Sequence, residues 1–390
     1  MKISLSFLFC LAFFTSFFFN GVNVLNALGY YDKLGPNMLS PTVLLFSILA
    51  ILLYINSFVV ETVFVIMVGV LLLMAFFLFL FKFTIFPNCL YTTFFMPIII
   101  CYCIDSLKFK LDKKKLLFIF YSFFLIECFL AIFERIFFKC VFPNLGFETY
   151  FNLGNELFRS YALYGHPLSN SGMILVMSSF ILIYQKNLNK KFFYYALGVV
   201  AILCFNSRFA FILDLSFGGV YFFRYVSFIS KSEWDKIKLI FWGLIAVFLV
   251  QRLISSGLGD RMIAYGIYDE SSAGARIEIF DIFKGYTFFD FLVPVSYGQF
   301  YSMMQNYTHG IIENAWIILM FRYGLIWMII TATIYVILFK KRFNHVKKTD
   351  LFFLLIPWLL NISSSNSIAN ASIAIGQLFL FQFIMEGEKK

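Results

Sequence analysis

Apolar runs long enough to cross a bilayer recur along the whole chain, and this feature limits the possible folds more than any other. A helix needs about 20 mainly apolar residues to span the hydrocarbon core. Of the 390 residues, 61% are hydrophobic and only 13% are charged, which excludes an ordinary soluble globular protein. We therefore expect an all-α polytopic membrane protein.

The apolar runs predict about 12 transmembrane helices. We expect them at 3–19, 42–56, 58–81, 88–104, 116–138, 169–185, 192–205, 209–223, 239–254, 312–339, 350–364 and 367–384. The predicted organisation has three parts: residues 1–254 with helices one to nine and an outer loop near 139–168, a large extracytoplasmic loop at 255–311, and residues 312–390 with helices ten to twelve and a short cytoplasmic tail.

The lysines predict how the chain is oriented in the membrane. Twenty of the 31 Lys and Arg residues fall near the termini or in short loops that this arrangement places on one side, and eighteen of these twenty are Lys. The positive-inside rule makes that side cytoplasmic, with both termini inside. The net charge of +10 is thus a topology signal, and we expect no nucleic-acid partner. The expected location is a cytoplasmic membrane that the chain crosses several times.

Arginine is enriched among the cations outside these loops. Seven of the remaining eleven are Arg: Arg135, Arg159, Arg208, Arg252, Arg261, Arg276 and Arg322. Orientation requires only charge, whereas the planar guanidinium binds phosphate or carboxylate in a bidentate manner. The alternative is that each of these arginines snorkels or pairs with a nearby carboxylate. For the group as a whole we favour anion binding at the outer face.

The large loop contains most of the polar residues that suggest chemistry. The stretch from Arg276 to Phe283 has the spacing of an amphipathic helix, which would lie along the membrane interface. His309 and Glu313 stand at i and i+4, so they share a face if the tenth helix has begun. A carboxylate can orient a histidine and raise its basicity. The alternative is a solvated His and a Glu that favours the helix dipole.

Polar residues also occur in and between the predicted helices. Glu127 lies in an apolar run, where a carboxylate marks a partner or a site, while Glu134-Arg135 has the pattern of a local ion pair. His166 precedes a proline, and a histidine there is more often a structural hydrogen-bonding group than a base. Arg208 follows a tight turn that does not require a cation. Nucleotide-binding glycine loops and histidine metal motifs are absent, so we expect neither a cofactor nor a metal.

These residues resemble motifs of the Wzy-type O-antigen and capsule polymerases and the related O-antigen ligases. The matching stretches are Arg159-Ser-Tyr-Ala-Leu-Tyr-Gly-His166-Pro167, Asn206-Ser207-Arg208-Phe-Ala, Gly274-Ala-Arg276, and His309-Gly-Ile-Ile-Glu313-Asn314-Ala-Trp-Ile followed by Gly324. Their order and the late outer loop agree with the family over most of the chain. One departure is that the family often has His directly before Asn, where this chain has Glu313.

The resemblance implies metal-independent, inverting glycosyl transfer from an undecaprenyl-diphosphate-linked oligosaccharide at the outer leaflet of the bilayer. Arg208 and Arg276 would hold the diphosphate, with Arg159, Arg322, His166 and Asn314 as further substrate-binding residues. Either His309 or Glu313 would act as the catalytic base. A chain-length regulator and a flippase are the implied protein partners, and the product would be O-antigen of lipopolysaccharide or capsule.

Two other functions fit the sequence. A ligase would pass the finished glycan to a different acceptor, and the motifs do not separate ligases from polymerases. A lipid-linked oligosaccharide flippase or another secondary transporter belongs to a different class. Transporters usually place charge near the midplane in two related halves, whereas here the charge gathers at one face and the halves look unrelated. Polymerases are commonly less similar to one another than ligases are, and this chain matches the motifs weakly, so the polymerase is the preferred prediction.

Overall fold

The computed structural model describes residues 4–19, 25, 39–57, 61–80, 87–142, 158–225, 233–255, 278–305, 307, 312, 314–363, 368 and 372–386. Within these ranges the chain forms helices and no strand. The helices are α1 (Leu5–Phe18), α4 (Pro41–Ser57), α5 (Thr62–Leu80), α6 (Pro87–Cys89), η1 (Leu90–Phe95), α7 (Met96–Leu107), α8 (Lys113–Phe137), α10 (Pro167–Tyr184), α11 (Leu188–Cys204), α12 (Arg208–Arg224), α13 (Glu233–Ser255), η4 (Ile279–Phe283), η5 (Phe288–Phe291), α16 (Tyr297–Gln305), α17 (Ala315–Phe343), α18 (Lys348–Ser363) and α19 (Ala374–Met385).

Every predicted apolar run contains a helix, which fits a multi-pass membrane protein. Among the described residues, five helical segments are long and apolar enough to cross a membrane: Thr62–Leu80, Leu90–Leu107, Lys113–Phe137, Pro167–Tyr184 and Ala315–Phe343. Several other apolar helices are shorter. The all-helical fold is thus confirmed for the described part of the chain, and the number of twelve spans stays a prediction.

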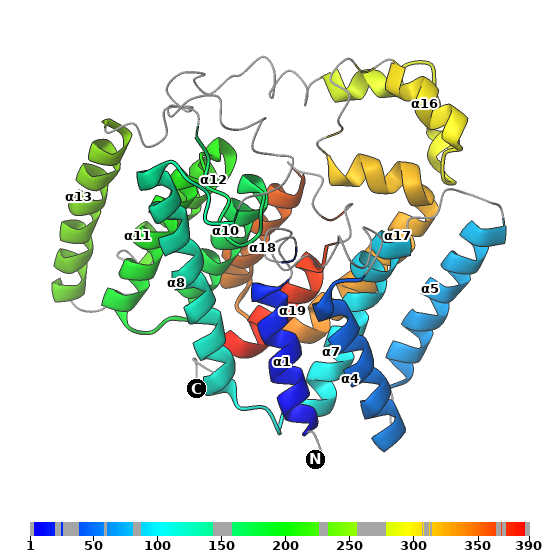
Figure 1. The fold of residues 1–390 in the computed structure, drawn as a ribbon, viewed down its shortest axis with the longest axis horizontal. Coiled ribbons are helices and arrows are strands. Elements are labelled where there is room, and N and C mark those ends of the chain that lie inside the picture. Colours follow the sequence, from blue (N-terminus) through cyan, green and yellow to red (C-terminus); the bar gives the residue numbers. More distant parts are fainter. Residues whose placement is uncertain are drawn as a thin grey trace.

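The helices differ in how deeply they lie in the bundle. Helices α10, α18 and α19 run through its middle, while α5 and α13 stand at opposite edges (Figure 1). In the most apolar 18-residue stretch of each helix, 89% of the residues of α10 are buried, but only 28% of those of α5. A helix that is apolar on all sides needs either protein or lipid around it. The exposed apolar surface of α5 is therefore where we expect lipid to contact the protein.

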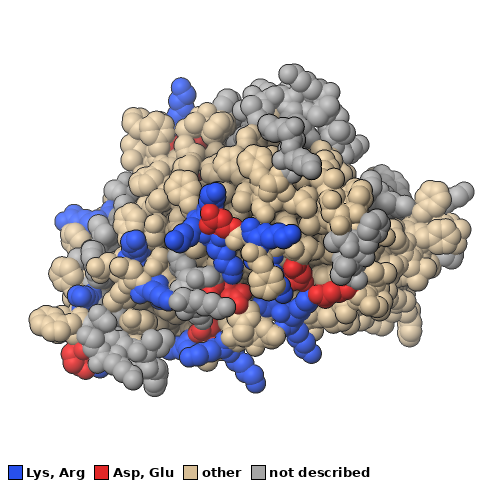
Figure 2. Space-filling model, turned by 90° about the horizontal axis from the view of Figure 1, so that it is seen from below, with Lys and Arg blue, Asp and Glu red and all other residues tan. Residues whose placement is uncertain are grey.

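The lysine-rich ends of the helices lie together on one face, as the predicted topology requires. Figure 2 shows this face, with many Lys and Arg side chains and a smaller number of Asp and Glu. Arg224 at the end of α12 pairs with Asp350 at the start of α18, with 3.1 Å between Nη1 and Oδ1. Lys113 at the start of α8 lies over the ring of Phe383 near the end of α19. These contacts join helix ends that the sequence assigned to the same side.

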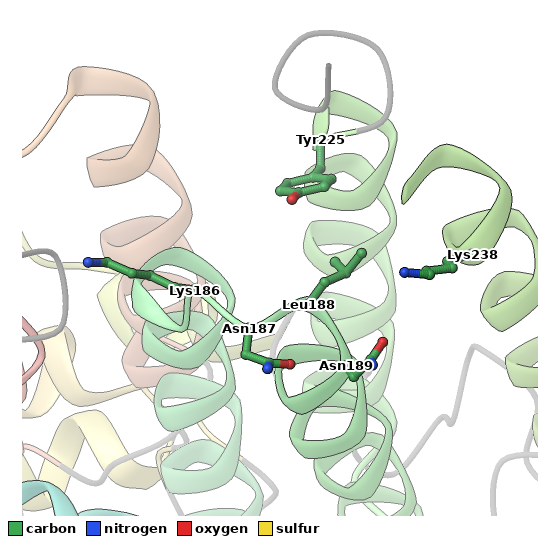
Figure 3. A pocket seen from close by; sticks show the side chains of 6 residues that line it. All are labelled: Lys186, Asn187, Leu188, Asn189, Tyr225 and Lys238. Carbon is green, nitrogen blue, oxygen red and sulfur yellow. The ribbon is translucent and has the colours of Figure 1, made fainter. Parts of the chain in front are cut away.

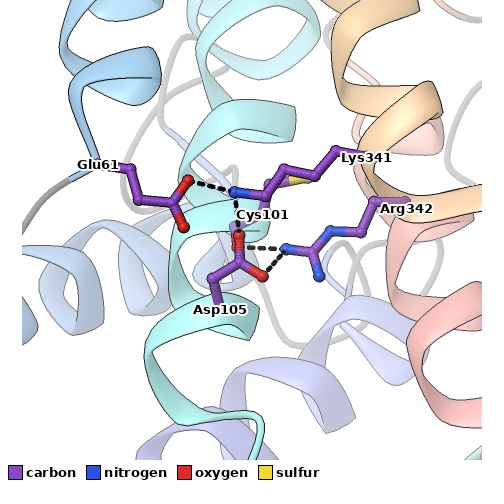
Figure 4. A network of polar contacts seen from close by, with 5 residues as sticks. All are labelled: Glu61, Cys101, Asp105, Lys341 and Arg342. Atoms are coloured by element: carbon purple, nitrogen blue, oxygen red, sulfur yellow. Dashed lines mark hydrogen bonds and ion pairs between the residues drawn. The ribbon is translucent and has the colours of Figure 1, made fainter. Parts of the chain in front are cut away.

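A second cluster on this face joins three helices (Figure 4). Lys341 Nζ in α17 lies 2.5 Å from Glu61 Oε2, just before α5, and 2.8 Å from Asp105 Oδ2 in α7. Arg342 Nη2 lies 2.9 Å from Asp105 Oδ1 and donates to the backbone oxygen of Cys101 at 2.6 Å. Asp105 is therefore the carboxylate that both cations of α17 share.

We expect Asp105→Asn to lower the free energy of unfolding by about 1–3 kcal/mol, between the values typical of exposed and buried ion pairs. The amide removes the charge that neutralises Lys341 and the half-buried Arg342. Glu61→Gln is the matched control, because the Glu61 side chain is 54% exposed and its loss should cost less than about 1 kcal/mol. Thermal unfolding of both variants checks this, and equal shifts would contradict it.

Helix α17 is broken at Gly324, which differs from the single straight helix predicted at 312–339. Gly324 has φ +78° and ψ 158°, a backbone conformation that favours glycine. A Cβ on Gly324 would lie 2.6 Å from the backbone carbon of Val293. The section before the break lies at an angle to the section after it (Figure 1). The break therefore divides α17 into a short first section and a second section from Leu325 to Phe343.

The described part of the predicted large loop packs onto the first section of α17. A small apolar core joins residues of the loop to those of α17: Ile279, Ile282, Phe291, Val295, Met303, Tyr307, Ile312, Ile317 and Phe321. The amphipathic helix predicted from Arg276 is, over its described residues, the short 3-10 helix η4. Its buried residues Ile279 and Ile282 are three apart, which is the repeat of a 3-10 helix.

Candidate functional site

A buried, irregular segment at residues 158–166 forms the centre of the candidate site. It lies where α8 and α11 end and where α10 and α12 begin, at the end of the bundle opposite the lysine-rich face. Residues 158–163 and Gly165 are buried, although this stretch forms no helix. Irregular backbone at membrane depth is tolerated only where protein satisfies its polar groups. The neighbouring helices supply those partners.

Two carboxylates of α8 accept hydrogen bonds from the backbone of this segment. Glu134 Oε2 accepts from Tyr161 N at 2.7 Å and from Ala162 N at 2.9 Å, and its Oε1 accepts from Val141 N at 2.8 Å. Glu127 Oε2 accepts from Leu163 N at 3.2 Å. Both side chains are fully buried. The structure thus gives Glu134 backbone partners where the sequence suggested a local ion pair with Arg135.

Two arginines fix the other half of the segment. Arg135 Nη1 donates to the backbone oxygen of Phe158 at 2.7 Å, and Arg159 Nε donates to the backbone oxygen of Phe205 at 3.1 Å. The backbone N–H of Ser160 donates to Cys204 O at 3.1 Å. The segment is therefore bound along the C-terminal end of α11. Arg159 reaches the turn that leads into Arg208, so the structure brings these two predicted residues to one place.

The turn between α11 and α12 holds an unsatisfied polar group. Asn206 has φ +55°, which asparagine tolerates better than most residues. Its side chain is 3% exposed, and neither Oδ1 nor Nδ2 has a hydrogen-bond partner among the described residues. A buried amide without partners is unfavourable. The sequence suggested only a turn-forming role here, whereas the structure shows a donor and an acceptor beside Arg159.

His166 begins α10 as its N-cap and lies outside that helix. Its Nδ1 accepts a hydrogen bond from Leu168 N at 3.3 Å, so in the neutral ring the proton is on Nε2. Burial, and then the charge of Arg159, lower the pKa of His166 to about 4. The imidazole is therefore neutral at neutral pH. This fits the structural role that the sequence favoured for a histidine before proline, and it leaves Nε2–H as a donor in the site region.

The low pKa of His166 predicts a pH-dependent stability. The pKa of His166 is near 6.5 in the unfolded chain and about 4 in the folded protein. Between these two pH values the unfolded chain binds more protons at this residue than the folded protein does. The fold therefore becomes less stable as the pH falls through that range. His166→Asn keeps a good N-cap and removes the titration. The variant should lose less thermal stability than the native protein between pH 7 and pH 5. Parallel pH profiles for the two proteins would contradict this.

Asn314 and Arg322 lie in a different part of the structure, the first section of α17. Asn314 is the N-cap of α17, and its Oδ1 accepts from Trp316 N at 3.0 Å and from Ile317 N at 3.2 Å. Trp316 Nε1 donates to Ser363 Oγ at the end of α18 at 2.7 Å. Arg322 sits two residues before the break at Gly324. Both predicted residues therefore belong to the first section of α17, whose start is bonded to the end of α18.

Three predicted residues lie outside the part of the chain that the structure describes: Arg276, His309 and Glu313. Their roles remain predictions. Of the groups that the structure adds, Glu127 and Glu134 carried a signal in the sequence, because carboxylates are rare in apolar helices. Asn206 stands in one of the matching motifs, where the sequence indicated only a turn, and the backbone groups carried no signal.

A separate hollow lies on the lysine-rich face. It has a volume of about 270 Å³ and is lined by Lys186, Asn187, Leu188, Asn189, Tyr225 and Lys238. In Figure 3 the Lys186 side chain points away from Lys238, and Asn187 Oδ1 already accepts from Lys190 N at 3.1 Å. The two lysines do not converge on one ligand position. Among the described residues, no group of three or more His, Cys, Asp or Glu side chains could hold a metal ion.

The fold and the site define a class, a helical protein that fits several passes through a membrane and that carries a buried polar segment at one end of its bundle. Comparison with known proteins takes the assignment no further. No protein-family model matches the chain, and no curated protein matches it.

Proposed function

We propose that the chain is an oligosaccharide repeat-unit polymerase that acts at the outer face of the bacterial cytoplasmic membrane. One observation carries the proposal, the binding of Arg159 to the turn that leads into Arg208. Helix α12 runs from Arg208 to Arg224, about 25 Å at 1.5 Å per residue, so the two arginines lie far from the lysine-rich face. Guanidinium groups held in this way suit a lipid diphosphate at the opposite leaflet.

The proposed reaction transfers a glycan between two lipid-linked repeat units. A sugar hydroxyl oxygen of the acceptor attacks the anomeric carbon of the donor, and the bond from that carbon to the diphosphate oxygen breaks. The acceptor proton passes to His309 or Glu313, and undecaprenyl diphosphate leaves. Negative charge builds on the diphosphate as the bond breaks, which is the charge that Arg208, Arg276 and Arg159 would stabilise. The anomeric configuration inverts, and neither metal nor cofactor is required.

Asn206 adds a polar contact to this proposal. Its buried amide offers both a donor and an acceptor next to the Arg159–Phe205 contact. Two neighbouring sugar hydroxyls, one donating to Oδ1 and the other accepting from Nδ2, would satisfy both atoms of the amide. We therefore place Asn206 with Arg159 and Arg208 among the substrate-binding residues.

Transport of a lipid-linked oligosaccharide is the second candidate, and one observation favours it. Glu127 and Asp214 are buried within apolar helices, and Oε1 of the former and Oδ2 of the latter have no hydrogen-bond partner among the described residues. Buried carboxylates of this kind serve proton-coupled transport in other membrane proteins. The ligase remains the alternative within the enzyme class, because the same arginines would hold the same donor.

Chain growth in vitro tests the proposal. The purified full-length protein in lipid nanodiscs would receive lipid-diphosphate-linked repeat units in the presence of EDTA. We expect a ladder of products that is lost in Arg276→Ala and in His309→Ala. Transfer only to a lipid-core acceptor would make the protein a ligase. Movement of labelled lipid across a proteoliposome membrane, with neither product formed, would overturn the enzyme assignment in favour of transport.

A further inference from the structure

The outer segment at 278–305 carries a pair of exposed phenylalanines on a rigid turn. Phe288 is 65% exposed and Phe289 is 75% exposed, whereas Phe291 in the same 3-10 helix η5 is buried. A capping box fixes the turn, because the Asp290 carboxylate accepts from Thr287 N at 2.6 Å and from Thr287 Oγ1 at 2.9 Å. The two rings are therefore held outward by the backbone, and they do not reach the small core of the segment.

Contacts with α17 fix the position of this turn along the direction in which that helix would cross the membrane. Ile326 N donates to Leu292 O at 3.3 Å, and Val295 N donates to Phe321 O at 3.0 Å. From Gly324 the second section of α17 continues for 19 residues to Phe343, close to its lysines. At 1.5 Å per residue this is about 28 Å, close to the thickness of a hydrocarbon core of about 30 Å. Residues 288–292 thus lie at the level where a bilayer would end.

Helix α5 gives the same level independently. The rings of Phe77 and Trp327 are in contact, with centroids 5.7 Å apart, and α5 runs in the opposite direction to α17. Because the two helices are antiparallel, the residue three places after Phe77 lies at the same height as the residue three places before Trp327. Leu80 is therefore level with Gly324. Phe79 is 72% exposed and Ile329 of α17 is 63% exposed. The exposed rings of η5 thus extend the apolar outer surfaces of α5 and α17 by one turn.

We propose that Phe288 and Phe289 insert into the outer boundary between lipid headgroups and acyl chains and anchor the outer segment to the membrane surface. Phenylalanine is among the residues that form the apolar faces of segments that lie at this depth without crossing the membrane. The hydrogen bonds from Thr287 lower the pKa of Asp290, so its carboxylate is charged and limits the depth to the headgroup level. The anchor does not depend on the reaction proposed above.

Site-specific fluorescence in lipid nanodiscs tests the anchor. The half-buried Cys10 and Cys140 are replaced by Ser, and a bimane label is attached at Phe289→Cys. We expect a lipid with a doxyl quencher high on its acyl chain to remove the emission to the same extent as for Phe79→Cys, the lipid-facing control on α5. Lys284→Cys is the water-facing control, since its side chain is 72% exposed and pairs with Asp281, and its label should respond to iodide instead.

Two outcomes would overturn the anchor. If iodide quenches the label at position 289 while the lipid quencher does not, the turn lies in water. If neither quencher reaches the label, or if its emission changes with the number of protein copies in each nanodisc, another protein surface covers the turn. Because each label replaces an exposed side chain, these variants are expected to fold, and unchanged thermal unfolding checks that they do.

Discussion

Arg208→Ala should lower the rate of glycan transfer by about two to three orders of magnitude, equivalent to about 2.7–4 kcal/mol of transition-state stabilisation. The guanidinium would contact the diphosphate as negative charge builds on it. Arg208→Lys keeps the charge but loses the planar fork, so it should retain part of the rate. The measurement is the initial rate of chain growth for each protein at a saturating concentration of the lipid-linked donor.

The fold is expected to survive the loss of Arg208. This residue begins α12, and a positive charge at a helix N-terminus is unfavourable by about 0.3–1 kcal/mol. Replacing Arg208 by alanine removes this unfavourable charge and should slightly raise the free energy of unfolding. A strong fall in activity with an unchanged midpoint of thermal unfolding would assign Arg208 to substrate binding. A fall of both together would assign it to the fold and would contradict the proposal.

Arg224 offers a control on the same helix. It ends α12 on the lysine-rich face, where it pairs with Asp350 and donates to Thr349 Oγ1 at 2.8 Å. Arg224→Ala removes an equal charge from the other end of α12, far from the proposed site. We expect this variant to be somewhat less stable and to transfer glycan at the native rate per folded molecule. If both variants lose transfer alike, overall charge or folding explains the loss, and a diphosphate site at Arg208 does not.

The helices could be predicted because the thickness of a bilayer sets the length of each apolar run. The lysines then indicated which helix ends share a face, and contacts such as Lys341 with Glu61 confirm that grouping. The break at Gly324 was not predictable. A glycine within an apolar run is compatible with a continuous helix, and only the packing of Val293 against it explains the positive φ.

The candidate site was predicted in part. Arg159, His166 and Arg208 carry charge or ring nitrogens that stand out in an apolar sequence, and the structure places Arg159 beside both the turn before Arg208 and His166. The scaffold that holds them was harder to infer. Glu134 next to Arg135 has the pattern of an ion pair, yet it accepts from backbone N–H groups 7, 27 and 28 residues later in the chain. Every residue except proline has a backbone N–H, so the sequence does not indicate which of these groups bind a carboxylate.

Glu134→Ala should have the largest effect on stability of the substitutions considered. It leaves three backbone N–H groups without their acceptor, those of Val141, Tyr161 and Ala162. An unsatisfied buried donor costs about 1–3 kcal/mol, so we expect a total loss of about 3–5 kcal/mol after partial relaxation. Because the segment carries Arg159 and His166, transfer should fall with stability. Hydrogen exchange measured by mass spectrometry should show rapid exchange of the Tyr161 and Ala162 amides.

Glu127 supplies the matched control for this second prediction. It is an equally buried carboxylate on the same helix. Its Oε2 accepts from Leu163 N, while its Oε1 has no partner among the described residues. The amide of Glu127→Gln keeps one acceptor oxygen, so the bond to Leu163 survives and the buried carboxylate is removed. Glu134→Gln cannot keep both of its accepting oxygens. We therefore expect faster exchange at 161–162 in Glu134→Gln than in Glu127→Gln, and the reverse order would show that Glu134 does not hold the segment.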